Sequence, residues 1–182
     1  TLREDFDLIK NHLKLPASHQ WFAYYNLEKT VGPDLLDQQV CGNNILIGNS
    51  SAASNNHIEA FKYLSPIRSA VGEIIVPLSY GDSDYREEIM KVGEKLFESQ
   101  FQPLIEFVER EEFNKKLLTC RFAIMNHCRQ QGFGTVVTLV WLGCKVFFNP
   151  ENTIFAYLKR LGVNVFSTEE LENANKLDVF TG

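Results

Sequence analysis

The stretch ILIGNSSAASNNHIEAFKYL, residues 45–64, decides the fold because it joins a strand, a polar loop and a helix in that order. The apolar residues at 45–47 predict a buried strand, and the next ten residues are nearly all small or polar. Beyond them, Ile58, Phe61 and Leu64 recur at the spacing of one helix face. This unit is typical of parallel sheets with crossover helices.

The same unit recurs along the chain. Further strand candidates are EIIV at 73–76, PLIEFV at 103–108, FAIM at 122–125, KVFF at 145–148 and VNVF at 163–166. Their nearly continuous hydrophobicity indicates strands that are covered by helices on both faces. Between them, apolar residues at helical spacing are Tyr85, Ile89, Val92 and Leu96; Phe113 and Leu117; Val136, Leu139 and Val140; and Phe155, Leu158 and Leu161. We therefore expect an α/β fold over residues 45–182, with a doubly wound, mostly parallel sheet of about six strands.

Local signals predict where the segments begin and end. Asp84 and Glu87 have the spacing of a capping box, and Gly143 and Gly162 are placed to end later helices. Residues 1–44 have another pattern, with an amphipathic start, a break at Pro16, the aromatic run WFAYY at 21–25 and a Gly-Pro turn. We interpret them as a connector and edge segment.

Composition excludes several classes of protein. The chain has 182 residues, 45% of them hydrophobic, and a net charge of −5 with scattered Lys and Arg, which argues against a nucleic-acid binder. The four cysteines form no C-x-x-C pair and three lie in apolar runs, so we expect reduced thiols. The start, TLREDFDLIKNHLK, is too charged for a signal peptide, and no apolar run approaches the roughly 20 residues of a membrane span. We expect a cytoplasmic location with at most peripheral membrane contact.

Ligands of open parallel sheets bind outside the carboxyl ends of the strands, which directs attention to the loops there. The first, residues 48–57, is dense in short polar side chains whose hydroxyls and amides could bind phosphate or sugar oxygens. Its candidate binding residues are Asn49, Ser50, Ser51, Ser54, Asn55, Asn56 and His57. The alternative is that Ser54 or Asn55 only caps the next helix.

The second candidate loop is HCRQQGFGT, residues 127–135. Its Gly-x-Gly lets the backbone approach a ligand, and the helix after it would direct its positive end toward a diphosphate. Arg129 adds a fixed positive charge, and the candidate residues are Arg129, Gln130, Gln131, Gly132, Gly134 and Thr135. A bare Gly-x-Gly can also mark only a tight turn.

The remaining polar groups have simpler interpretations. Asp82 and Asp84 could bind a metal ion, but acidic residues in a first helical turn need no metal to explain them, so we expect none. His57 and His127 both lie where a strand leads into a helix and are the catalytic candidates. The alternative for each histidine is a local hydrogen bond.

Several of these segments together resemble the 4-acetamido-4,6-dideoxygalactose (Fuc4NAc) transferases of enterobacterial common antigen synthesis. They are ILIGNSSAASNNHIEA at 45–60, IIVPLSYGDSDYREEIMKVGEKLF at 74–97, RQQGFGT at 129–135, and FNPENTIF at 148–155 followed by VNVFSTEEL. The resemblance implies a GT-B glycosyltransferase, in which this chain is the C-terminal domain that binds a dTDP-sugar through the two loops named above. It implies no metal or other cofactor.

The same resemblance implies a lipid-linked glycan acceptor, bound through a second domain that these residues lack, and work at the cytoplasmic face of a bacterial inner membrane. An isolated half of this kind can bind its donor without turning it over. The main alternative is a non-catalytic module that binds a nucleotide or nucleotide-sugar on the same scaffold. Both hypotheses require the two loops to meet at one edge of the sheet.

Overall fold

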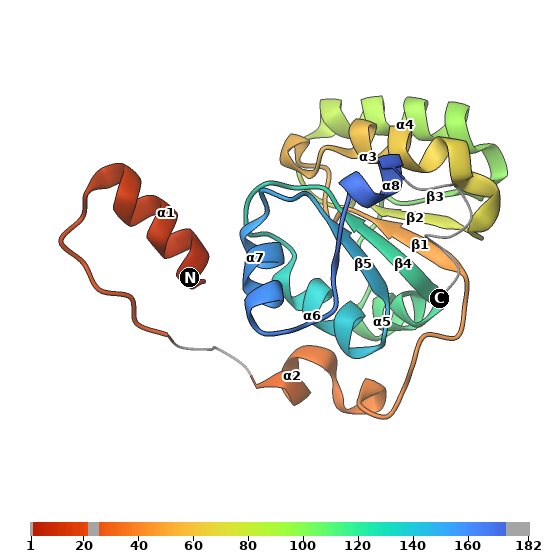
Figure 1. The fold of residues 1–182 in the computed structure, drawn as a ribbon. Coiled ribbons are helices and arrows are strands. Elements are labelled where there is room, and N and C mark those ends of the chain that lie inside the picture. The colour runs from red at the N-terminus through yellow and green to blue at the C-terminus, as the bar shows by residue number, and fades with distance from the viewer. Residues whose placement is uncertain (1, 22–25, 174–182) are drawn as a thin grey trace.

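The computed structural model describes residues 2–21 and 26–173, and within them the chain forms a six-stranded sheet (Figure 1). The strands are β1 (Asn44–Ile47), β2 (Ile74–Pro77), β3 (Phe101–Leu104), β4 (Cys120–Met125), β5 (Lys145–Phe148) and β6 (Phe166–Ser167). Their order in the sheet is β3-β2-β1-β4-β5-β6, and every pair is parallel. This confirms the predicted α/β fold with a doubly wound sheet.

The order of the strands reverses between β1 and β4. From β1 the chain builds outward through β2 and β3 on one side, and from β4 it builds outward through β5 and β6 on the other. β1 and β4 are paired in register up to Ile47 and Ile124, so both strands end at the same edge of the sheet. The loops that follow them therefore open into the crevice where open α/β sheets bind ligands.

Helices cover both faces of the sheet. The described residues form the helices α1 (Arg3–Leu13), α2 (Leu27–Val31), α3 (His57–Leu64), α4 (Ser83–Phe97), α5 (Arg110–Thr119), α6 (Phe133–Trp141), α7 (Thr153–Arg160) and α8 (Glu169–Asn173). Four short 3-10 turns lie at Pro33–Leu35, Ala53–Asn55, Ser65–Ala70 and Glu98–Gln100. Figure 1 shows α3, α4 and α8 on one face, and α5, α6 and α7 on the other.

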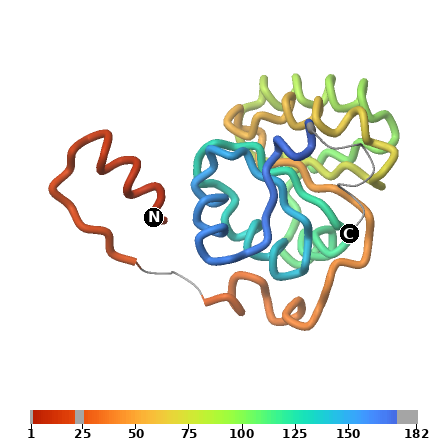
Figure 2. The backbone as a smooth tube through the Cα atoms, viewed as in Figure 1, coloured from red at the N-terminus to blue at the C-terminus, as the bar shows by residue number. Residues whose placement is uncertain are grey.

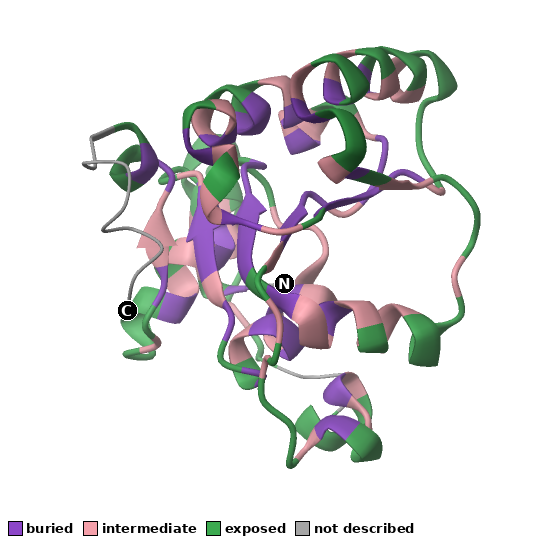
Figure 3. Cartoon of the chain, turned by 90° about the vertical axis from the view of Figure 1, so that its right-hand side faces the viewer, coloured by how far each residue is buried: buried purple, intermediate pink, exposed green. Residues whose placement is uncertain are grey.

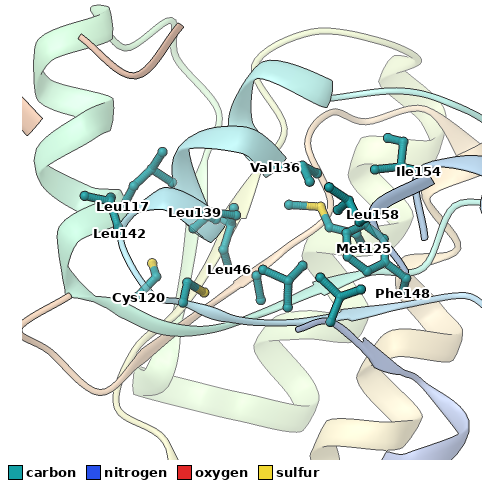
Figure 4. Close-up of a cluster of buried hydrophobic side chains, with 14 of the residues drawn as sticks. Leu46, Leu117, Cys120, Met125, Val136, Leu139, Leu142, Phe148, Ile154 and Leu158 are labelled. Atoms are coloured by element: carbon teal, nitrogen blue, oxygen red, sulfur yellow. The ribbon is translucent and has the colours of Figure 1, made fainter. Parts of the chain in front are cut away.

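Alternate residues of each strand enter two separate cores. On β1, Leu46 faces the α6 side while Ile45 and Ile47 face the α3 side, as expected from the two-residue period of a strand. The four inner strands, β1, β2, β4 and β5, are consequently mostly buried between two helical layers whose outer surfaces are exposed (Figure 3). The core under α6 and α7, drawn in Figure 4, is built by Leu46, Leu117, Cys120, Met125, Val136, Leu139, Leu142, Phe148, Ile154 and Leu158.

The second core is aromatic at its centre. Phe61 of α3 meets Phe97 and Phe101 edge to face, with ring centroids 5.2 and 6.0 Å apart. Gly93 of α4 makes room for this group, because an added Cβ would lie 2.3 Å from the Phe101 ring. α4 can therefore approach the sheet closely where β3 begins.

The N-terminal segment packs on the helical layer and not on the sheet. α1 lies against α7, where Arg160 Nε donates to Glu4 Oε1 at 2.7 Å, and Figure 2 shows this segment outside the sheet. Val31 and Leu35 are buried in the core under α6. No strand forms in residues 2–21 or 26–43, so the described part of residues 1–44 supplies helices and connections where an edge element was expected. Residues 22–25 of the aromatic run lie outside the described residues.

Two strands differ from their predicted positions. The apolar run at 103–108 predicted a strand, but β3 is Phe101–Leu104, and Phe107 is 78% exposed. Pairing with β2 determines the register of β3, and as an edge strand it tolerates Pro103. The run at 163–166 contributes only Phe166 to β6, whose register is set by β5.

Two helix boundaries also differ. α4 begins at Ser83 and is capped by Asp82, whose Oδ1 accepts a hydrogen bond from the Tyr85 backbone N–H at 2.7 Å, so the predicted capping box at Asp84 and Glu87 is wrong. α7 ends at Arg160, which leaves Leu161 beyond the helix and 54% exposed. Gly143 and Gly162 do end their helices, with φ of +84° and +76°.

All four cysteines carry free thiols; Cys120 and Cys144 are buried, whereas Cys41 and Cys128 are exposed. Burial raises the pKa of the Cys120 thiol to about 12 and that of Cys144 well above its ordinary value. Both buried thiols therefore stay protonated and pack as small apolar side chains. Among the described residues, no helix is long and apolar enough to cross a membrane.

Candidate functional site

The two candidate loops meet at the reversal point of the sheet. Residues 48–56 leave β1 and residues 126–132 leave β4, and their side chains bond directly to one another. Ser54 Oγ donates to Gln131 Oε1 at 3.0 Å, and Gln131 Nε2 donates to Asn49 Oδ1 at 3.1 Å. A Cβ on Gly132 would lie 3.1 Å from the Asn49 side chain. The loops thus form one polar surface on the same edge of the sheet.

Asn55 holds the β1 loop in shape. Its side chain is fully buried, accepts a hydrogen bond from the Asn49 N–H at 3.0 Å, and donates to the carbonyl oxygens of Ser50 and Ala52. It therefore does not cap α3, and neither does Ser54. The N-cap of α3 is Asn56, which has a left-handed φ of 51° and makes no capping bond with its side chain.

Gly48 allows the loop to pass over His57. It has a φ of +69°, and a Cβ at this position would lie only 2.5 Å from His57 Nε2. A side chain here would be strained by the backbone angle and would also collide with the imidazole. Glycine therefore allows the first turn of the loop to contact the buried histidine closely.

Both candidate histidines are fully buried, with no exposed surface. His57 Nδ1 lies 3.3 Å from the Tyr85 hydroxyl, and His127 Nδ1 lies 2.9 Å from the Arg129 carbonyl oxygen. Burial lowers the pKa of each imidazole to about 4, and repulsion from His127 adds to the effect at His57. Both rings are consequently neutral at physiological pH. Their Nε2 atoms are buried and make no hydrogen bond with any described residue.

Two helix ends open onto the polar surface. α6 begins after Gly132, which has a φ of +61° and lacks a side chain that could cap the helix, and α3 begins after the non-capping Asn56. By contrast, α4 and α7 are capped by Asp82 and Asn152. The first amides of a helix have no partner within it and lie at its positive end. At the start of α3 the His57 N–H already donates to the Tyr85 hydroxyl at 3.2 Å, so the amides that can bind an anion are those of the next residues of α3 and those at the start of α6.

Arg129 supplies a positive charge beside these helix ends. Its side chain is exposed, and its Nε donates to Gln131 Oε1 at 3.0 Å, the same oxygen that accepts from Ser54. Gln131 thus restricts the guanidinium and leaves its terminal nitrogens available for bidentate bonds to phosphate oxygens. A cation and two helix ends together can neutralise a diphosphate.

The predicted residues divide into two groups. Some are buried and brace the loops: Ser50, Ser51, Asn55, His57 and His127. Others reach the surface and could contact a ligand: Asn49, Ser54, Asn56, Arg129, Gln130, Gln131, Gly132, Gly134 and Thr135. The buried residues are held by hydrogen bonds within the loop, as for Asn55, and by hydrogen bonds to other segments, as for Ser51 and His57, and the sequence pattern alone reveals neither kind.

Tyr80 joins the same surface and was not predicted. It follows β2, and its hydroxyl accepts a hydrogen bond from Asn49 Nδ2 at 3.0 Å. The sequence offered one signal, an aromatic residue beside Gly81 in a turn at the carboxyl end of a strand. In the same turn Asp82 is engaged as the cap of α4, and among the described residues no three His, Cys, Asp or Glu side chains come together as metal ligands do.

Solved structures with this fold include domains of sugar-transferring enzymes. The "OtsA apo structure" aligns with a TM-score of 0.59 and 10% identity over 85% of this chain and 40% of that one. The α,α-trehalose-phosphate synthase (UDP-forming) from Burkholderia xenovorans, in complex with glucose-6-phosphate, aligns with a TM-score of 0.55 and 12% identity over 85% of this chain and 40% of its own. At these identities the likeness concerns the fold alone.

The chain spans only part of the length of the longer structures that it matches. This chain spans about 40% of the two long structures but 90% of the C-terminal domain of the glycosyl transferase group 1 protein LpcC from Francisella tularensis, with a TM-score of 0.50 and 10% identity over 88% of this chain. The fold is that of a Rossmann-like domain of a GT-B glycosyltransferase. The family model described as 4-alpha-L-fucosyltransferase, glycosyl transferase group 56, matches residues 6–179, and the chain belongs to that family.

Proposed function

We propose that this chain is the donor-binding half of a glycosyltransferase and that it holds a nucleoside-diphosphate sugar where the β1 and β4 loops meet. The observation that carries the proposal is the direct bonding of the two loops through Gln131, Asn49 and Ser54 beside two helix starts without side-chain caps. Membership of a glycosyltransferase family supports the same conclusion independently.

In this proposal the diphosphate lies over the starts of α3 and α6, with Arg129 beside it. These groups stabilise the donor, and they stabilise the leaving nucleoside diphosphate more strongly because negative charge grows on it as the sugar bond breaks. In this proposal Gln130 and Thr135 bond the remaining polar atoms of the donor, whereas Asn56 Nδ2 donates to the Asn126 carbonyl oxygen at 2.9 Å and helps to hold the two loops together. The buried, neutral histidines support the loops and take no part in proton transfer.

The finer identity of the substrates follows from the sequence resemblance. It favours a dTDP-linked 4-acetamido-4,6-dideoxygalactose as the donor and a lipid-linked glycan as the acceptor, in the synthesis of a bacterial surface polysaccharide. The acceptor would bind to a second domain, across a cleft from the polar surface described above. This chemistry places the enzyme at the cytoplasmic face of the inner membrane.

Ligand-induced stabilisation tests the proposal. The melting temperature of this chain should rise with dTDP or UDP, and calorimetry should give a dissociation constant. Arg129→Ala should weaken binding by about tenfold or more, because it removes a charged hydrogen bond worth about 1.5–3 kcal/mol.

A pair of glycine variants provides a matched control. Gly132→Ala places a methyl group against Asn49 at the site, whereas Gly143→Ala, also at positive φ, meets no atom within 4 Å. Both should lose some stability because of the backbone angle, but only Gly132→Ala should weaken nucleotide binding. Absence of any shift with either nucleotide would refute the proposal, as would equal loss of binding in the two glycine variants.

A further inference from the structure

Tyr80 presents an unusual combination of exposure and constraint. Its side chain is 61% exposed at the carboxyl edge of the sheet, beside the β1 loop. Its backbone oxygen accepts hydrogen bonds from both the N–H and the hydroxyl of Ser51, each at 2.8 Å, and Gly81 pairs with Ser51 as an isolated bridge. The backbone of Tyr80 is therefore fixed to the loop of the proposed donor site.

The other end of the side chain is also fixed. The Tyr80 hydroxyl accepts from Asn49 Nδ2, and Asn49 Oδ1 accepts from Gln131, which in turn restrains Arg129. One chain of hydrogen bonds thus crosses three loops, with the aromatic ring at the β2 end and the guanidinium at the β4 end. An exposed ring held at both ends has little conformational freedom left to lose when a flat group binds against it.

We propose that the ring of Tyr80 stacks on the base of the nucleotide donor. The inference rests on the proposed function, because it needs the diphosphate at the starts of α3 and α6. A nucleoside diphosphate is elongated, with its charged part at one end and a flat aromatic base at the other. A diphosphate beside Arg129 that extends toward β2 brings the base to Tyr80, and aromatic side chains hold bases by stacking.

Competition binding separates the base from the phosphates. Tyr80→Ala should weaken dTDP binding between about fivefold and a hundredfold, the range expected when one stacked base loses its aromatic partner. Binding of inorganic pyrophosphate, which has no base, should change less than twofold. Tyr80→Phe keeps the ring and should retain most of the affinity for dTDP.

Phe107→Ala is the matched control, because Phe107 is a more exposed aromatic residue that follows the neighbouring strand β3. It should leave dTDP binding unchanged. Since stacking tolerates every base, the loss in Tyr80→Ala should be similar for dTDP and UDP.

The outcomes also separate this inference from the function on which it rests. If wild-type protein binds dTDP and Arg129→Ala weakens that binding, but Tyr80→Ala does not, the stacking role is overturned and the proposed function stands. Equal weakening of dTDP and pyrophosphate by Tyr80→Ala would also overturn it, because the residue would then act through loop shape. If the wild type binds neither dTDP nor UDP, both proposals are overturned.

Discussion

Lowering the pH below 6.5 should destabilise this chain before most of its carboxylates become protonated. His57 and His127 are buried and neutral in the fold, with pKa values of about 4, compared with an ordinary value of 6.5 in the unfolded chain. Between these values the unfolded state binds more protons than the folded state. The stabilisation is therefore fully present above pH 6.5 and is lost as the pH falls toward 4.

The size of the effect follows from the two pKa values. Between the two pKa values, each histidine changes the free energy of unfolding by about 1.4 kcal/mol per pH unit. The two histidines together should therefore give a slope of about 2.7 kcal/mol per pH unit within this window. At pH 5 the loss is about 4 kcal/mol, a large part of the roughly 5–15 kcal/mol that stabilises a typical domain. Most carboxylates titrate near pH 4, so the interval from pH 6.5 to 5 reports chiefly on histidines.

Urea unfolding followed by circular dichroism at pH 7.5, 6.5, 5.8 and 5.2 measures this slope. His57→Gln and His127→Gln should each lower stability at pH 7.5, because they disturb a packed site, but each should also remove about half of the slope. The double variant should be nearly insensitive to pH in this range. A free energy of unfolding in the wild type that stays constant between pH 6.5 and 5.2 would refute the burial argument.

Three substitutions test the loop geometry by urea unfolding. Gly48→Ala should cost about 2–4 kcal/mol, because it combines a positive φ with a contact against His57; a cost below about 1 kcal/mol would show that the loop relaxes easily. Asp82→Ala should cost about 1 kcal/mol through loss of the α4 cap, whereas Asp84→Ala should cost clearly less, and the reverse order would contradict the observed cap. Asn55→Ala should cost about 2 kcal/mol or more and weaken nucleotide binding as well, since it leaves the Asn49 N–H and the Ser50 and Ala52 carbonyl oxygens without this partner; unchanged stability would exclude its bracing role.

The central strands could be predicted because their signal is local. The runs at 45–47, 122–125 and 145–148 are apolar and bounded by polar or helical segments, and they form β1, β4 and β5 close to those limits. The loops that follow these strands can be predicted as easily as the strands, because they are rich in small and polar residues. Knowing that parallel strands share one carboxyl edge was then enough to bring residues 48–56 and 126–132 together.

The features that could not be predicted depend on contacts between residues that are far apart in the sequence. The register of β3 is fixed by β2 and not by its own composition, so an apolar run extending to Phe107 misled the prediction. The spacing to Glu87 favoured Asp84 as the cap, but the Asp82 N–H donates to the Ser51 carbonyl oxygen, which fixes where α4 begins. The same contact between loops brought Tyr80 to the site, and the local signal for it, an aromatic residue beside Gly81, does not show which loop it meets.

The buried amide of Asn55 also has a kinetic consequence. Because Asn55 already satisfies the backbone of the β1 loop from within, the proposed nucleotide ligand would meet preorganised contacts and would lose little ordering entropy. Encounter should then proceed at rates usual for a rigid binding site, and differences in affinity among related nucleotides should appear mainly in their residence times.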